Sequence, residues 1–173
     1  MSTILDVPHF EQSGEGYCLP ACARMVLAYL GMERTEAEIA QLLGTQRFGT
    51  PNFAILKLAA WGVEVDFRVW ELSELLSALA KEQPVIVFVQ TGFLDYWEED
   101  FAHAIVVVGV TDKQQFWIHD PSQPEGARQA SLNGLLAAWY EFGYKGAALQ
   151  VMPQKDSWLS RAIGWFRYRT PSG

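Results

Sequence analysis

The hydrophobic pattern of this chain changes period near Gly62, and that change constrains the fold more than any other feature. Before Gly62 the apolar residues recur with helical spacing, whereas several later segments alternate or are continuously apolar. The longest apolar runs, 84–89 and 104–110, have the length of strands and are too short for a membrane-spanning helix. Helices first, then a mainly antiparallel sheet with one or two interposed helices, indicate an α+β domain rather than a doubly wound one.

Capping signals bound three helices that we expect in the first part of the chain, over 18–30, 35–44 and 50–62. The first has proline in its first turn, where the missing N–H costs no hydrogen bond. The second begins with a T-x-x-E capping box. In the third, Thr50 is expected to cap the helix, and proline takes the first helical position.

Strands and helices are both expected after Gly62. The expected strands are 63–70, 84–90, 103–110, 115–120 and 146–152. Helices are expected over 71–82 and 131–142. Residues 91–101 break the periodicity and carry many acidic and aromatic side chains, so we expect a long surface loop. It either borders a cleft or is a solvated acidic loop.

Charge and composition limit the partners and the compartment. The 173 residues carry a net charge of −7, which argues against nucleic-acid binding. A basic amphipathic stretch at 153–173 follows an acidic domain over 1–152. We expect this stretch to form a helix that packs on the body or, through 156–169, contacts a partner protein or a membrane surface. Two cysteines and no stretch typical of an export signal predict a cytoplasmic location.

Two cysteines, Cys18 and Cys22, lie four residues apart at the start of the first expected helix. They share one helical face, but no histidine or cysteine follows at zinc-site spacing, so a structural zinc lacks ligands. Cys22 is expected to be a small buried core residue. Cys18 lies where unpaired N–H groups and the helix dipole favour an anion, which activates a thiol as a nucleophile. An inert buried cysteine is the alternative.

A histidine and an aspartate are expected to meet across two neighbouring strands. If 112–113 form a two-residue hairpin loop, the register places Ile105 opposite Asp120. His103 and Asp120 then share one face of the sheet as diagonal neighbours, close enough for a carboxylate to orient an imidazole. His119 has the opposite parity and is expected to point to the other face.

Together these residues make a Cys-His-Asp constellation that suits acyl transfer. Such chemistry also needs hydrogen-bond donors for the oxyanion that forms on the scissile carbonyl. The backbone N–H of Cys18 is one candidate donor, and the side-chain amide of Gln12, six residues earlier, is the other.

The stretch Q-S-G-E-G-Y-C-L-P-A-C, which begins at Gln12, resembles the opening motif of the bacteriocin-processing cysteine peptidases, the double-glycine leader peptidases with a papain-like fold. In that family a glutamine lies six residues before the nucleophilic cysteine, and a second cysteine often follows four residues after it. The segments around His103 and Asp120 resemble the family's histidine and aspartate strands. The resemblance covers roughly residues 5–152.

This resemblance implies a papain-like cysteine peptidase fold over 1–152, with N-terminal helices packed on the sheet. It implies that a peptide or protein substrate is cleaved without a cofactor. It implies that Cys18 is the nucleophile and that His103 acts as both general acid and general base. Asp120 would orient the histidine, and the Gln12 amide would belong to the oxyanion hole.

The chain departs from the family's pattern next to the nucleophile. The family usually has glycine directly after the cysteine, where this chain has Leu19 and Pro20, which narrows the space for a substrate. Many members are domains of peptide-exporting transporters, whereas this chain resembles the stand-alone branch, for which specificity for double-glycine leaders is not implied. Leu19, Tyr17, Tyr96 and Trp97 are expected to contact the substrate.

Two alternatives to a peptidase remain open. One is a catalytically inactive module of the same fold that binds a peptide or leader without cutting it. The other is an amidase or acyl-transferring enzyme with the same triad, because the acyl-enzyme chemistry is shared.

Overall fold

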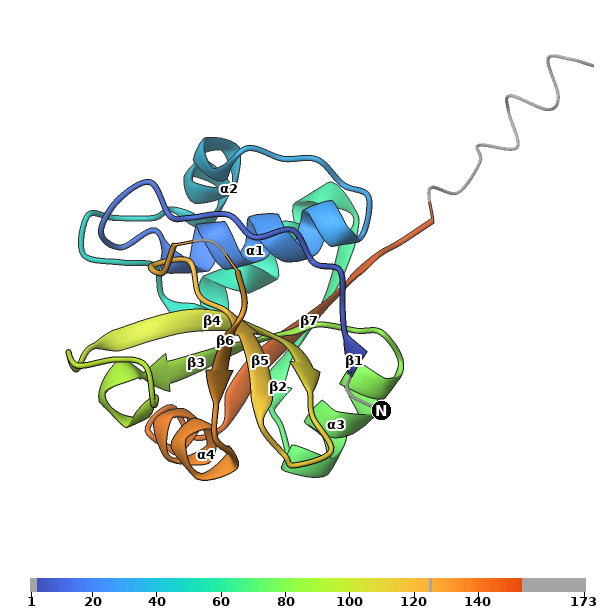
Figure 1. Cartoon of the computed structure of the whole chain (residues 1–173). Helices are drawn as coiled ribbons and strands as arrows, with labels where there is room; N and C mark the ends of the chain where they lie inside the picture. The colour runs from blue at the N-terminus through green and yellow to red at the C-terminus, as the bar shows by residue number, and fades with distance from the viewer. Residues whose placement is uncertain (1–2, 125, 154–173) are drawn as a thin grey trace, which may run out of the picture.

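The fold is built on one sheet with helices on both sides (Figure 1). The computed structural model describes residues 3–124 and 126–153. The strands are β1 (Thr3–Ile4), β2 (Val63–Val69), β3 (Val85–Gln90), β4 (Ala102–Val110), β5 (Phe116–His119), β6 (Arg128–Ala130) and β7 (Lys145–Val151). They follow the order β2-β7-β3-β4-β5-β6, with β1 paired to β4, and all of these pairings are antiparallel. The expected α+β class is confirmed.

The helices divide between the two faces of the sheet. They are α1 (Cys18–Tyr29), α2 (Glu36–Leu43), α3 (Leu72–Ala80) and α4 (Leu132–Tyr140), with 3₁₀ helices η1 (Asn52–Trp61) and η2 (Thr91–Phe93). Figure 1 shows α1 and α2 above the sheet and α3 and α4 below it. The expectation that N-terminal helices pack on the sheet is therefore confirmed.

One predicted helix start is confirmed and another is wrong. At α2 the Glu38 N–H donates to the Thr35 hydroxyl at 3.2 Å, and the Thr35 N–H donates to the Glu38 carboxylate at 2.8 Å. The expected α-helix over 50–62 is instead the 3₁₀ helix η1, and Thr50 does not cap it. The Thr50 hydroxyl is engaged with the Thr45 hydroxyl at 2.8 Å, so it does not turn toward the N–H groups of η1.

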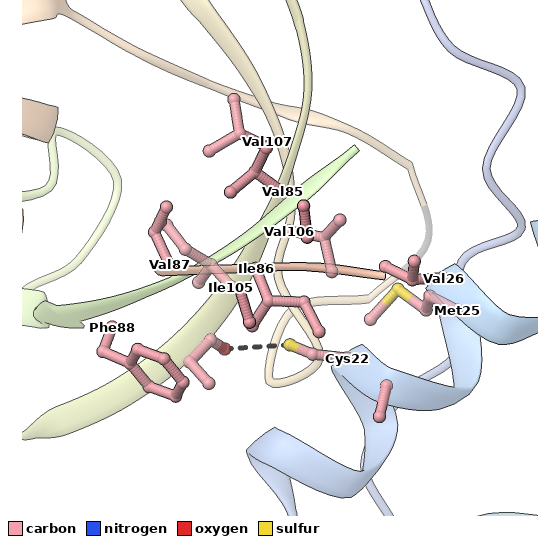
Figure 2. Close-up of a cluster of buried hydrophobic side chains, with 14 of the residues drawn as sticks. Cys22, Met25, Val26, Val85, Ile86, Val87, Phe88, Ile105, Val106 and Val107 are labelled. Carbon is pink, nitrogen blue, oxygen red and sulfur yellow. Dashed lines mark hydrogen bonds between the residues drawn. The ribbon is translucent and has the colours of Figure 1, made fainter. Parts of the chain in front are cut away.

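One part of the core lies between α1 and the centre of the sheet (Figure 2). Cys22, Met25 and Val26 of α1 are fully buried against apolar side chains of β3 and β4. The Cys22 thiol donates a hydrogen bond to the Ala104 carbonyl at 3.2 Å, and burial raises the pKa of this thiol well above its ordinary value. The prediction that Cys22 is a core residue is confirmed.

The β4–β5 hairpin departs from its predicted turn but reaches the predicted register at its open end. The turn is one residue longer than the expected two-residue loop, because the Thr111 N–H donates to the Gln115 carbonyl at 2.8 Å. A β-bulge after Val107 then shifts the register back by one residue. Beyond the bulge Val106 pairs with His119, as the predicted register requires. The two departures cancel.

Some expectations fall outside these elements. The expected basic helix within 153–173 lies outside the described residues, of which Pro153 is the last. Within the described ranges, no helix is long and apolar enough to cross a membrane. Strand β6 was not expected from the sequence, because its three residues are too few to show a period.

Candidate active site

A cavity of about 1080 Å³ opens where the N-terminus of α1 meets the start of β4. Its walls come from the segment before α1, from 44–52 and from the first residues of β4, and they include Gln12, Cys18, His103 and Ser122. Polar side chains that are far apart in the sequence thus lie around one cavity in the fold.

Cys18 is the first residue of α1 and is partly exposed. The preceding Tyr17 makes no side-chain cap, and the first turn of α1 holds no acidic residue. The positive end of the helix dipole therefore lies at Cys18. Cys18 and Cys22 are both free thiols. The described residues contain no cluster of three or more His, Cys, Asp or Glu side chains suited to a metal ion.

Gly16 shapes the loop that leads into Cys18. Its φ of 80° lies in the left-handed region, and a Cβ there would lie 2.7 Å from the Gly49 nitrogen and 2.9 Å from the Gln46 oxygen. Gln46 and Gly49 close a tight turn through two backbone hydrogen bonds of 3.0 and 2.9 Å. The turn 46–49, which forms one cavity wall, therefore packs directly on the backbone of Gly16.

His103 lies between Cys18 and Asp120. Its Nε2 donates to Oδ1 of Asp120 at 2.8 Å, and the Cys18 thiol lies close enough to the same ring to influence its pKa. His103 is 5% exposed and Asp120, which directly follows β5, is 0% exposed. The structure thus brings together the three side chains that the sequence places in one site.

The charges of this group reinforce one another. Burial alone would lower the pKa of His103, but hydrogen bonds to Asp120 and Cys18 and their charges outweigh it and raise that pKa to about 9. Burial would raise the pKa of Asp120, but the hydrogen bond and charge of His103, aided by further donors, hold it below its ordinary value. Both shifts favour an imidazolium beside a carboxylate.

Asp120 has three further donors. The Ser122 N–H donates to Oδ1 at 2.9 Å, and Oδ2 accepts from the Trp97 indole at 2.8 Å and from the Tyr96 hydroxyl at 3.0 Å. Tyr96 and Trp97 were expected to contact the substrate, yet neither lines the cavity and the polar atoms of both bind Asp120. The reason is that a buried carboxylate requires donors, a demand that a sequence pattern does not display.

The Gln12 side chain is oriented by two contacts. Its amide nitrogen donates to the Gly14 carbonyl at 2.8 Å, and its oxygen accepts from the Ser122 hydroxyl at 2.9 Å. Because a carbonyl only accepts, Gly14 determines which end of the amide is the nitrogen. One N–H is used by Gly14, and Gln12 lines the cavity together with Cys18.

Leu19 and Tyr17, the other two residues expected to contact the substrate, line different hollows. Leu19 lines the cavity next to Cys18 but is only 1% exposed, so most of its surface belongs to the core. Tyr17 instead lines a neighbouring hollow of about 460 Å³ beside α2, together with Ser13 and Glu36. Of these two side chains, Leu19 is the one beside the thiol.

Two residues that contact the site were missed from the sequence. The His9 Nε2–H donates to the backbone carbonyl of Asp120 at 2.9 Å, and Ser122 binds both Asp120 and Gln12. The His119 ring packs edge-on against His9 at 5.3 Å, and burial with the neighbouring His9 lowers the pKa of His119 to about 4. Closeness to Asp120 in sequence was a signal for Ser122; His9 offered none.

Comparison with known sequences establishes the family. A model of the Peptidase_C39 like family matches residues 4–147. An uncharacterised protein of Methanothermobacter marburgensis is 33% identical over 115 residues, which is 65% of this chain and 72% of that protein. The chain belongs to the Peptidase_C39 like family.

Solved structures share the fold. A C39-like protein of Bacillus anthracis superposes with a TM-score of 0.72 at 16% identity, covering 87% of this chain and 98% of that one. A double glycine motif protease from an AMS/PCAT transporter, in complex with its leader peptide, gives a TM-score of 0.68 at 20% identity and covers 88% of this chain and 99% of that one. The fold is therefore that of the papain-like C39 peptidase domains.

Proposed function

We propose that this member of the Peptidase_C39 like family is a cysteine peptidase that cleaves a peptide bond with Cys18 as its nucleophile. The observation that carries the proposal is the position of His103, which lies beside the Cys18 thiol on one side and hydrogen-bonds the buried Asp120 carboxylate on the other. A thiol that merely fills the core needs no imidazole beside it. The fully buried Cys22 hydrogen-bonds a backbone carbonyl instead. The complete set of side chains favours an active enzyme over a module that only binds peptide.

In the proposed reaction, the Cys18 sulfur attacks the scissile carbonyl carbon and the C=O electron pair moves to the oxygen. The Cys18 N–H and the second amide N–H of Gln12 stabilise this oxyanion. Since Nε2 of His103 is held by Asp120, Nδ1 gives its proton to the leaving amine as the C–N bond breaks, and a thioester remains. Water then gives a proton to His103 and attacks the thioester, the C–S bond breaks, and the thiolate returns.

The charges of the site suit this order of events. A pKa of about 9 keeps His103 protonated at neutral pH, so a proton is ready for the leaving amine. The imidazolium lies beside Cys18, and the positive end of the α1 dipole lies at the same residue. Asp120 stays ionised and stabilises the imidazolium without taking its proton.

We infer a peptide or protein substrate. The similar double glycine motif protease is held with a leader peptide, and in this chain the cavity is large enough for several residues of an extended peptide. Phe48 and Phe101, which are 87% and 37% exposed, line that cavity and offer apolar contact to peptide side chains.

We also propose a cytoplasmic location. Both cysteines are free thiols, and the proposed nucleophile must stay reduced to act. A reducing compartment keeps such thiols unpaired.

Alkylation by iodoacetamide tests the proposal. At about pH 6, where an ordinary thiol is almost fully protonated, we expect fast modification of Cys18, located by peptide mass spectrometry. His103→Ala should slow it by about tenfold or more, since the imidazolium no longer favours the thiolate. Cys22→Ala, the matched control, should leave the rate unchanged. A Cys18 that reacts no faster than a free thiol at every pH refutes the peptidase and favours the binding module.

A further inference from the structure

The far side of the Asp120 carboxylate is held by two side chains of the loop 91–101 that do not line the cavity. We propose that Tyr96 and Trp97 are positioning residues that fix Oδ2 of Asp120. The other oxygen, Oδ1, is thereby held toward His103. The catalytic consequence rests on the proposed function, whereas the geometry does not.

Each oxygen of Asp120 has two donors. Oδ2 accepts from the Trp97 indole at 2.8 Å and from the Tyr96 hydroxyl at 3.0 Å. Oδ1 accepts from His103 at 2.8 Å and from the Ser122 N–H at 2.9 Å. Because Asp120 is 0% exposed, its charge depends on these donors, and rotating the carboxylate would break all of them together.

The loop 91–101 that carries both side chains is anchored to the start of α4. Asp95 accepts the Ser131 N–H at 2.7 Å and the Ser131 hydroxyl at 3.0 Å. A Cβ at Gly134 would lie 2.8 Å from the Asp95 carboxylate, so the glycine makes room for this contact. Asp95 directly precedes Tyr96, and its attachment to α4 therefore places the hydroxyl that reaches Asp120.

The same loop is closed at its ends by Thr91. The Thr91 hydroxyl donates to the Glu99 carbonyl at 2.6 Å and accepts from the Phe101 N–H at 3.0 Å. The Thr91 N–H donates to the Phe101 carbonyl, also at 3.0 Å, and Thr91 is 0% exposed. These bonds make the loop a fixed support, whose rigidity is what a positioning role requires.

Aromatic rings enclose the histidine on the same side. The Trp97 ring lies edge-on to His103 at 5.7 Å and to Phe101 at 5.0 Å, and Phe101 lies 5.8 Å from His103. Phe101 lines the cavity, and Trp97 does not. Trp97 thus combines a donor to Asp120 with an apolar cover over the His103 ring.

The other titratable groups around Asp120 come from several elements: Cys18 and Cys22 of α1, His103 of β4, Tyr96 of the loop, and His9, which binds its backbone carbonyl. Burial is the main cause that raises the pKa of both Cys22 and Tyr96, so these two side chains stay neutral. Removing the donor of Tyr96 or Trp97 therefore changes hydrogen bonding and leaves the formal charges as they are.

The imidazole N–H between His103 and Asp120 reports on this positioning. In proton NMR near neutral pH we expect a downfield resonance, assigned by its loss in His103→Gln. Its exchange with solvent should accelerate by about tenfold in Trp97→Phe and in Tyr96→Phe, because each removes one hydrogen bond to a charged group. Tyr29→Phe, the control, removes a tyrosine hydroxyl that donates to a backbone carbonyl of another segment and should leave exchange unchanged.

Alkylation of Cys18 across pH adds a second readout. In Trp97→Phe the acid limb of the rate should move to higher pH, because losing a donor raises the pKa of Asp120. Tyr96→Phe, which deletes a single oxygen, carries the test where Trp97→Phe does not fold. Unchanged N–H exchange in the folded variants overturns the positioning role. A wild-type Cys18 that alkylates like a free thiol refutes the proposed peptidase instead, and N–H exchange still decides what Tyr96 and Trp97 do.

Discussion

The loop before Cys18 is expected to tolerate no side chain at Gly16. Its φ of 80° costs a non-glycine residue about 1–2 kcal/mol. The alanine Cβ would also lie 2.7 Å from the Gly49 nitrogen and 2.9 Å from the Gln46 oxygen, backbone atoms that do not rotate away. Overpacking of this kind adds about 1–3 kcal/mol. We therefore expect Gly16→Ala to lower the free energy of unfolding by about 2–5 kcal/mol.

Two other glycines separate these contributions. Gly31 has a φ of 81°, but a Cβ added there would meet no atom within 4 Å, so Gly31→Ala measures the backbone strain alone, about 1–2 kcal/mol. Gly14 has neither a positive φ nor an atom within 4 Å of such a Cβ, so Gly14→Ala should be neutral or stabilise by up to about 1 kcal/mol. The difference between Gly16→Ala and Gly31→Ala isolates the contact with the turn 46–49.

Urea unfolding followed by circular dichroism gives the stabilities, and iodoacetamide alkylation of the folded proteins reports on Cys18. We expect Gly16→Ala to slow alkylation, because the displaced loop leads directly into the thiol, while the Gly14 and Gly31 variants react like the wild type. A Gly16→Ala protein as stable as Gly31→Ala, with an unchanged alkylation rate, would refute the close contact.

Three further predictions concern other parts of the molecule. The pKa of His119 is about 4 against an ordinary 6.5, so the unfolded chain binds a proton that the folded chain excludes between these values. The free energy of unfolding should therefore fall by about 2 kcal/mol as the pH falls through this window. In His119→Asn, urea unfolding should show a weaker dependence of this free energy on pH, and an equal dependence would contradict the prediction. Ser122→Ala frees the Gln12 amide, so kcat on an activated ester should drop by about tenfold while iodoacetamide, which forms no oxyanion, reacts as before. Rescue by Ser122→Thr is expected, and equal losses in both assays would argue against this role. Thr35→Ala removes a helix cap and should cost about 1 kcal/mol in urea unfolding without changing Cys18 alkylation; an unchanged urea midpoint would show that the cap contributes nothing.

Local signals were sufficient for the elements that carry the site. The capping box at Thr35 and Glu38 and the apolar runs of β3 and β4 act within a few residues, so a sequence pattern displays them. The start of α1 at Cys18 was predictable for the same reason. The cap predicted at Thr50 was wrong, because its hydroxyl is hydrogen-bonded to the Thr45 hydroxyl across a turn. The sequence did not reveal the shape of that turn.

The pairing of His103 with Asp120 was predicted from a strand register that is correct, although the turn assumed for it is not. The turn is one residue longer than assumed, and the bulge after Val107 compensates. Neither feature has a sequence signal here, since the left-handed residue of the turn is Gln114 rather than glycine. The support of Asp120 by Tyr96 was not predictable, because it depends on a loop whose path is set by distant contacts.

Capture of an acyl-enzyme tests the central claim most directly. The protein is mixed with the p-nitrophenyl ester of benzoyl-glycine, quenched in acid and digested for mass spectrometry, while nitrophenolate release is followed in parallel. We predict a burst of one nitrophenolate per protein, an acyl group on the peptide that contains Cys18, and slow turnover that is lost in Cys18→Ala and His103→Ala. An acyl group absent from Cys18, or ester hydrolysis that persists unchanged in Cys18→Ala, would contradict the proposed mechanism.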